Sequence, residues 1–268
     1  MATYQDVFKR VELKYLLSAR QYEALRERLT DLAEPDAYGE SQILNIYYDT
    51  PDFRLIRSSL MKPVYKEKLR LRSYGVPTGE TNTFVELKKK YKGVVYKRRV
   101  NMSYREAGYF LGNGILQHEP SQIEKEIFWF MHYYGTVVPA MAVSYDRIAM
   151  AGIEDPDLRI TFDRNIRWRT DQLDLRRGSC GQDLLQPGQR LMELKIAGAV
   201  PLELAGILDE LEIRQLSFSK YGSGYEEMQR QQWMRAREGG ARRLPVTGAG
   251  ASCSVFGAVP VQKQRISV

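Results

Sequence analysis

Between Lys66 and Arg72, every second residue of the chain is a cation. In the stretch KEKLRLRSYG these cations alternate with Glu67 and two leucines. Side chains of a β-strand point alternately to its two faces, so all four cations share one face, with neighbours about 7 Å apart. Like charges at this spacing repel each other unless an anion lies between them. A single strand of this kind can be a solvated face with its leucines turned to a core, so its meaning depends on whether the pattern recurs.

The same division into an apolar and a charged face recurs along the chain. It is found in FKRVELKYLL (8–17), ILNIYYD (43–49), TFVELKKK (83–90), VVYKRRV (94–100), AVSYDRIA (142–149), LRITFD (158–163) and LMELKIA (191–197). Three of these segments contain Glu-x-Lys, beginning at Glu12, Glu86 and Glu193. Together with the stretch at 66–75, this period of two predicts about eight strands, each with one face for a core.

The charged faces favour a closed sheet over an open one. Surface strands usually carry Thr, Ser, Gln and mixed charges, whereas these strands carry cations with isolated glutamates. About eight strands can close around a lumen wide enough for one ligand, and a lining of Lys and Arg is tolerated there when a polyanion or water fills it. We therefore predict an α+β fold: a closed antiparallel eight-stranded β-barrel with helices packed outside.

Helix signals flank the strands. Ser18 is an N-cap before a helical pattern, Ser121 and Glu124 form a capping box, and Pro201 opens another helix. From about Arg235 the periodicity is lost and Gly, Ala and basic residues dominate. We expect one domain over residues 4–233 and a flexible basic tail at 234–268.

The charge balance indicates an anionic partner. Lys and Arg number 40 against 33 Asp and Glu, which gives a net charge of +7. Nucleic acid, a membrane surface or a phosphate compound would each fit. The chain has neither a run of apolar residues long enough to span a membrane nor the apolar segment of a signal peptide, so a cytoplasmic protein is expected. Two cysteines and two histidines provide neither a disulfide framework nor a CxxC metal or redox pair.

The motifs taken together resemble the VTC domain, the polyphosphate polymerase branch of the CYTH-like triphosphate tunnel metalloenzymes. The resemblance is carried, in order, by RVELKYLL, YYDT, KLRLRSYG, FVELKKKYKGVVYKRRV, SYDR, LRITFD, LMELKI and SFSKYGSGY. It covers nearly everything before the tail. It implies a closed barrel whose tunnel binds triphosphate or a growing polyphosphate chain, with a divalent cation, Mn²⁺ or Mg²⁺, held by a glutamate.

The resemblance also assigns site residues by position. The matched phosphate ligands are Lys14, Arg70, Arg72, Lys88, Lys97, Arg147, Arg159, Lys195 and Lys220, with Tyr145 and Ser219 as hydrogen-bond donors. Arg70, Arg72, Lys88 and Lys195 are the predicted catalytic cations, and Glu193 is the predicted metal ligand. Alternation alone adds Arg10 and Lys68 to the phosphate ligands. The register of Arg98 and Arg99 stays open, so neither is assigned.

One departure from the family pattern bears on the reaction. Many tunnel hydrolases begin with Glu-x-Glu-x-Lys, whereas this chain has Arg10 in place of the first glutamate, followed by Glu12 and Lys14. Hydrolysis needs a water activated by metals and carboxylates, so the loss of a carboxylate favours holding phosphate over hydrolysing it.

The sequence therefore predicts a polymerase that transfers the γ-phosphate of ATP to orthophosphate or a polyphosphate chain. Two alternatives remain open: hydrolysis of tripolyphosphate or a nucleoside triphosphate, and a non-catalytic module that binds polyphosphate or nucleic acid. Nucleic acid is the less expected ligand, because glutamates placed regularly among the cations would repel its backbone. The resemblance also implies a separate membrane-protein partner that exports or stores the chain, and hence association with a membrane through that partner.

Overall fold

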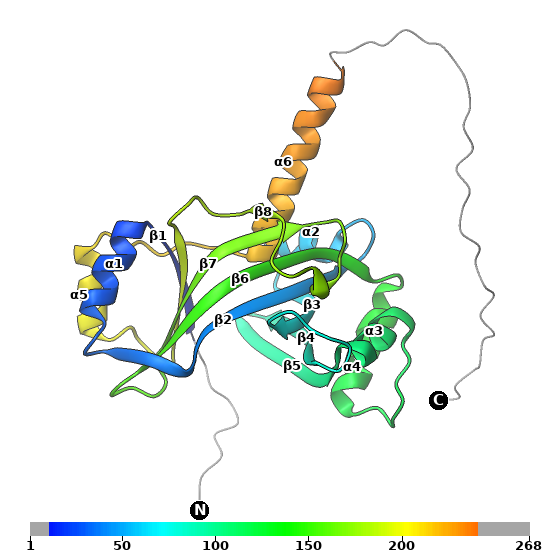
Figure 1. Ribbon diagram of the computed structural model, residues 1–268, viewed down its shortest axis with the longest axis horizontal. Coiled ribbons are helices and arrows are strands. Elements are labelled where there is room, and N and C mark those ends of the chain that lie inside the picture. The colour runs from blue at the N-terminus through cyan, green and yellow to red at the C-terminus, as the bar shows by residue number, and fades with distance from the viewer. Residues whose placement is uncertain (1–10, 241–268) are drawn as a thin grey trace, which may run out of the picture. The chain divides into compact units, whose positions relative to one another are not determined.

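The computed structural model of the chain describes residues 11–240 and is mixed α+β, with helices around one large antiparallel sheet (Figure 1). The strands are β1 (Val11–Leu17), β2 (Ala33–Asp49), β3 (Tyr65–Tyr74), β4 (Asn82–Tyr91), β5 (Val94–Ser103), β6 (Val138–Gly152), β7 (Arg159–Arg169), β8 (Gln182–Asp183) and β9 (Arg190–Ile196). The helices are α1 (Ala19–Arg28), α2 (Arg54–Leu60), α3 (Tyr104–Asn113), α4 (Gln122–Tyr134), α5 (Leu202–Glu210) and α6 (Lys220–Gly240), with a 3₁₀ turn η1 (Leu175–Arg177). Each segment predicted as a strand lies in a strand over most of its described residues.

The chain divides into two compact units, residues 1–229 and 230–268. In the second unit the described residues, 230–240, are helical. The predicted tail at 234–268 thus begins with helical residues, and its remainder from 241 lies outside the described residues. None of the helices described combines the length and apolar character needed to cross a membrane.

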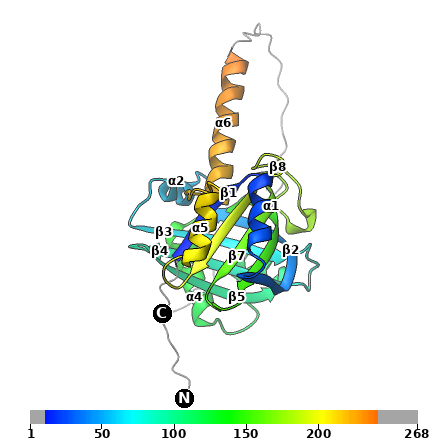
Figure 2. The same cartoon turned by 90° about the vertical axis from the view of Figure 1, so that its left-hand side faces the viewer.

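The predicted closure of the barrel is wrong. The strands run in the order β1-β9-β7-β6-β2-β3-β4-β5, with β8 beside β7, so that β1 and β5 are the two end strands. No backbone pairing joins β1 to β5 in the part of the chain that the structure describes. The sheet is strongly curved instead (Figure 2), and a side-chain contact, Lys88 Nζ to Glu12 Oε2 at 3.9 Å, reaches from β4 to β1. Closure depends on the summed twist and shear of all the strands, and here they leave β1 and β5 unpaired in the described residues.

Helices α1, α3, α4 and α5 cover the outer face of the sheet in two groups, as the prediction of helices packed outside requires, whereas α2 and α6 do not. Helices α1 and α5 pack on β1, β7 and β9 through a core that includes Leu25, Phe162 and Leu204. Helices α3 and α4 pack on β2 to β5 around Leu69 and Phe110. Capping boxes at Ser18, Ser103 and Ser121 fix where α1, α3 and α4 begin. Most apolar residues of the strands pack on this outer face, and a smaller group that includes Ile43, Met141 and Val143 packs on the opposite face.

The first turns of α6 pack with α2 against the other face of the sheet, called here the inner face. Tyr221 is 2% exposed, and its ring stacks on Tyr47 at 4.5 Å between centroids. Its hydroxyl donates to Asp49 Oδ2 at 2.8 Å, while the two Asp49 oxygens also accept from the backbone N–H groups of Leu55 and Ile56. The YYDT motif is therefore structural: Asp49 caps α2 and ties α6 to it.

Candidate functional site

The inner face of the sheet gathers cations from seven strands. Alternation places them opposite the apolar residues of the outer core, and the strand registers bring them level with one another. The cations are Lys14, Lys66, Lys68, Arg70, Arg72, Lys88, Lys90, Lys97, Arg99, Arg147, Arg159 and Lys195, and Lys220 joins them from α6. The carboxylates on the same face are Glu12, Glu86, Asp163 and Glu193. Cations clearly outnumber carboxylates, so the inner face carries a net positive charge.

Glu193 on β9 is the centre of one ionic cluster. Its Oε1 lies 3.0 Å from Lys220 Nζ and 3.6 Å from Lys14 Nζ, and its Oε2 lies 3.3 Å from Arg147 Nη2. Asp163, fully buried beside it, contacts Lys220 Nζ at 2.5 Å and Arg147 Nε at 2.6 Å. Burial acts to raise the pKa of Glu193, but the charges of Lys220, Lys14 and Arg147 outweigh it and hold this pKa well below its usual range.

Tyr145 on β6 forms the base of this cluster. Lys220 Nζ lies 4.6 Å from the centre of its ring and Arg147 Cζ lies 5.2 Å from it, which are cation–π distances. The Tyr145 hydroxyl accepts a hydrogen bond from Arg72 Nη2 at 3.1 Å. Tyr145 therefore connects the Glu193 cluster to the cations of β3.

Glu86 on β4 is the centre of a second cluster, and four cations surround it. Its carboxylate lies 2.6 Å from Arg70 Nε, 3.8 Å from Arg72 Nε, 2.6 Å from Lys97 Nζ and 3.2 Å from Arg99 Nε. Glu86 is 1% exposed. Burial would raise its pKa, but the charges of Arg70, Arg72 and Lys97 lower it to about 2. One carboxylate cannot neutralise four cations, so this cluster keeps a net positive charge.

Lys68 lies between the two clusters and contacts no carboxylate in the described part of the chain. Its Nζ donates to Ser219 Oγ at 2.9 Å, just before α6. Burial, together with the charges of Lys66 and Lys88, lowers the pKa of Lys68 to about 8, although Tyr47 acts the other way. Burial also lowers the pKa of Lys66, and that of Lys195. An anion bound among these ammonium groups would relieve the repulsion that destabilises their charged forms.

The structure brings most of the predicted site residues together. Lys14, Arg147, Lys220 and Glu193 meet in one cluster, Arg70, Arg72 and Lys97 meet in the other, and Lys68 and Ser219 contact each other. Lys195 lies opposite Glu12 in the register of β1 and β9, and Lys88 contacts Glu12. Arg159 is less central, since its side chain is half exposed and pairs with Asp36 at 3.4 Å. Arg10 lies outside the described residues.

Three residues of the clusters, Glu86, Arg99 and Asp163, were missing from the predicted set. Glu86 was recognised only as part of a Glu-x-Lys motif. Arg99 was unassigned because a slip of one residue moves every side chain of a strand to its other face. The two-residue turn fixes the register: Lys92 and Gly93 both have positive φ, of 46° and 86°, and Tyr91 pairs with Val94, which places Arg99 opposite Glu86. Asp163 shares a face with Arg159 in LRITFD, and this alternation was the available signal for it.

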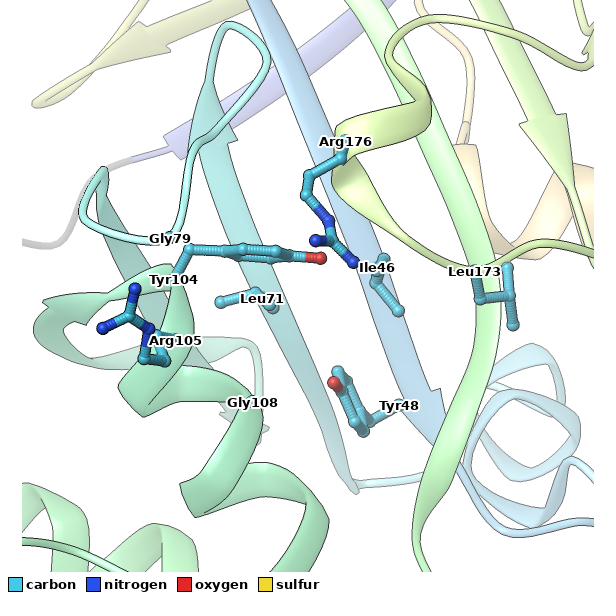
Figure 3. A pocket seen from close by; sticks show the side chains of 9 residues that line it. All are labelled: Ile46, Tyr48, Leu71, Gly79, Tyr104, Arg105, Gly108, Leu173 and Arg176. Atoms are coloured by element: carbon cyan, nitrogen blue, oxygen red, sulfur yellow. The ribbon is translucent and has the colours of Figure 1, made fainter.

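A separate cleft of about 470 Å³ lies on the outer face, between α3 and η1. Its floor is formed by Ile46, Tyr48 and Leu71, and Tyr104 and Arg176 face each other across its top (Figure 3). Arg176 pairs with Asp174 at 2.6 Å. None of the predicted site residues lines this cleft, so the candidate site is the inner face alone.

Comparison with known protein families agrees with this geometry. The family model of the VTC domain matches residues 9–229, which include every residue of the two clusters. The chain belongs to the VTC domain family. No curated protein matches it significantly.

Solved structures show where this VTC domain stands among known folds. A candidate adenylyl cyclase from Hippeastrum with a dominant triphosphatase activity is 16% identical, with a TM-score of 0.51, and the match covers 81% of this chain and 96% of that one. A candidate adenylate cyclase from Bacillus halodurans is 17% identical, with a TM-score of 0.48, over 78% of this chain and 93% of that one. The Hippeastrum structure supports a shared fold, the tunnel fold.

Proposed function

We propose that this VTC domain is a polyphosphate polymerase that transfers the γ-phosphate of ATP to orthophosphate or to the end of a polyphosphate chain. The observation that supports it most is the excess of cations on the inner face, arranged as two clusters with Lys68 between them. A row of cations with too few carboxylates fits an extended polyanion better than it fits a single small anion.

In the proposed reaction, a terminal phosphate oxygen of the acceptor attacks the γ-phosphorus of ATP. The bond between this phosphorus and the β–γ bridging oxygen breaks, the electron pair leaves with ADP, and the chain is one phosphate longer. The attacking oxygen is already anionic at neutral pH, so no side chain has to remove a proton. The main need is to hold two anions together and to neutralise the charge that develops between them.

The inner-face cations can meet this need because they are held in place before an anion binds. The Arg72 guanidinium donates to Asn45 Oδ1 at 2.9 Å and to the Tyr145 hydroxyl, and it is 6% exposed. Arg70 donates to Glu86 and to the Tyr47 hydroxyl. We assign Arg70, Arg72, Lys88 and Lys195 to the transferring phosphate, and the remaining predicted cations to the rest of the ATP triphosphate and the chain.

We propose that a divalent cation binds to the carboxylates at one end of this face, in the place of a lysine ammonium group. Glu12 and Glu193 are neighbours there, and Lys14 Nζ already lies between them, at 3.3 Å and 3.6 Å. Among the residues described, no group of three or more acidic, His or Cys side chains is close enough to hold a metal alone. Mn²⁺ or Mg²⁺ would therefore take Glu193 and Glu12 as protein ligands and phosphate oxygens or water for the remainder. When bound, it would supply additional charge neutralisation for the phosphates.

Hydrolysis of tripolyphosphate or a nucleoside triphosphate is the second candidate. The Hippeastrum protein with this fold has a triphosphatase activity, which favours it. The ionic pairing of the four inner-face carboxylates Glu12, Glu86, Asp163 and Glu193 disfavours hydrolysis, because each has a cation within 4 Å. A carboxylate that is paired with a cation in this way is a weak base for activating water. A module that only binds polyphosphate is the third candidate.

The deciding experiment supplies purified protein with ATP and Mn²⁺ and resolves the products by chain length, with free phosphate measured in parallel. Polyphosphate formed together with ADP, and lost in Glu193→Gln, is the expected result. Glu126→Gln is the matched control, because Glu126 pairs with Arg98 on the outer face at 3.1 Å. Free phosphate without polyphosphate chains would indicate a triphosphatase in place of a polymerase. Tight binding of tripolyphosphate without turnover would indicate a module that only binds polyphosphate.

A further inference from the structure

The tip of the β4–β5 hairpin and the loop before β3 expose apolar side chains beside lysines. The tip patch, as we define it, consists of Met61, Val64, Tyr65, Tyr91, Val94, Val95 and Tyr96 together with Lys62, Lys90 and Lys92. The exposed fraction is 85% for Met61, 63% for Val64 and 50% for Tyr96. Large side chains grouped on a surface in this way usually mark a binding surface.

The tip patch is continuous although its residues come from two parts of the chain. Tyr65 on β3 lies opposite Tyr91 on β4, and their ring centroids are 6.5 Å apart. Tyr91 in turn lies opposite Val94 across the turn of the hairpin. The Lys92 backbone N–H donates to the Val64 carbonyl at 3.0 Å, which fastens the loop to the hairpin. Tyr65, Tyr91 and Val94 therefore share one face of the hairpin, and Tyr96 follows on that face. Val95 and Lys90 lie on the other face, so the tip patch surrounds the end of the hairpin.

The lysines of the tip patch have no acidic partners. In the described part of the chain, no carboxylate pairs with Lys62, Lys90 or Lys92. Glu67, near Lys62 in the sequence, is buried at 9% exposure and accepts hydrogen bonds from the hydroxyls of Tyr65 and Tyr134. The patch thus combines exposed apolar groups with uncompensated positive charge.

We propose that the tip patch binds the surface of an anionic lipid bilayer. Val and Met side chains would enter the boundary of the acyl chains, Tyr would lie at the level of the headgroups, and the lysine ammonium groups would reach the lipid phosphates and carboxylates. Protein interfaces are depleted of Lys, which makes a protein the poorer match for this surface. The inference does not depend on the proposed reaction.

A second exposed apolar surface, on α4, provides a contrast. Trp129 is 66% exposed and Tyr133 is 74% exposed, so its aromatic groups are at least as accessible. The charges beside it are paired, however: Lys125 contacts Glu119 at 3.6 Å and Glu126 contacts Arg98. The α4 surface therefore has the apolar component without the net charge, and it supplies a matched control.

The test is co-sedimentation of the full chain with vesicles of phosphatidylcholine alone and of phosphatidylcholine mixed with phosphatidylserine. Tripolyphosphate is present throughout, so that the inner-face cations are occupied by another anion. Three variants are compared: Lys62→Gln with Lys92→Gln, Met61→Ser with Val64→Ser, and the α4 control Trp129→Ser. Thermal unfolding of each variant shows whether it is folded.

We expect the wild-type chain to sediment with the anionic vesicles and much less with the neutral ones. The lysine variant should bind about five-fold more weakly for each lysine removed, the apolar variant should also lose binding, and the α4 control should bind like the wild type. Unchanged binding of both tip variants would overturn the proposal, and so would equal loss in the α4 control. A wild-type chain that sediments with neither vesicle would also overturn it.

Discussion

The carboxylate of Glu86, buried among four cations, allows a quantitative test of the electrostatics of the inner face. The substitution is Glu86→Gln, because the Gln amide is close in shape to the protonated acid. It removes the negative charge and leaves Arg70, Arg72, Lys97 and Arg99 in place. The variant therefore compares the charged and neutral forms of this one side chain with little change in packing.

The expected loss of stability in Glu86→Gln follows from the pKa of Glu86. The surrounding cations lower the pKa of Glu86 from its ordinary 4.5 to about 2, against the opposing effect of burial. A change of one in pKa corresponds to about 1.4 kcal/mol, so at neutral pH the charged form stabilises the folded chain by about 3 kcal/mol relative to the neutral form. Because the pKa is depressed, this stabilisation is fully present above pH 4.5 and is lost as the pH falls from 4.5 toward 2.

The free energy of unfolding is measured with urea at pH 7, in a low-salt chloride buffer without phosphate or sulfate, since those anions would bind among the cations. Glu86→Gln should lower it by about 3 kcal/mol at an unchanged m-value. The control Glu126→Gln, whose partner Arg98 is half exposed, should lower it by less than about 1 kcal/mol. Below pH 4.5 the difference between the wild type and Glu86→Gln should shrink.

Tripolyphosphate supplies the second part of the test. The Gln variant leaves the four cations without their competing carboxylate, so tripolyphosphate should raise its free energy of unfolding more than it raises that of the wild type. If Glu86→Gln were as stable as the wild type, and if tripolyphosphate raised the free energy of unfolding of both by the same amount, the result would contradict the electrostatic reasoning. It would mean that the cost of burying the carboxylate cancels its attraction to the cations.

Three further predictions follow from the same structure. Since burial and like charges lower the pKa of Lys68 to about 8, the affinity for tripolyphosphate should fall as the pH rises through 8, with proton uptake on binding. Titration calorimetry should show a smaller step in Lys68→Met than in the wild type. The step should not vanish, because the charges of Arg70 and Lys68 outweigh the burial of Tyr47 and lower its pKa to about 8 as well. Arg72→Ala should abolish chain synthesis while the circular dichroism spectrum is retained. Arg72→Lys should not restore synthesis, because a lysine cannot contact both Asn45 and Tyr145. Asp49→Ala should lower the free energy of unfolding by about 3 kcal/mol, since it removes the cap of α2 and the hydrogen-bond acceptor of the buried Tyr221 hydroxyl. A decrease of less than about 1 kcal/mol would refute this structural role of Asp49.

Local alternation of side chains was sufficient to predict a large share of this protein. It identified segments of all eight long strands and most of their inner-face cations, because the two faces of a strand follow from a period of two and need no information from elsewhere in the chain. Capping at Ser18 and Ser121 is likewise set within one turn of a helix. The motif order, which also depends only on sequence, was enough to indicate the VTC family.

Closure of the sheet and the pairing of charges were decided by the tertiary structure. Whether β1 meets β5 depends on the summed twist and shear of every strand between them, which no single segment encodes, and the sheet stays open at this point. The two-residue turn at Lys92 and Gly93 sets the register that brings Arg99 to Glu86. Asp163, Glu193 and Lys220 come from three separate elements, and only folding shows that the predicted metal ligand is already surrounded by cations. The sequence determined which charges lie on the inner face, and the fold determined which of them neutralise each other and which remain available to an anion.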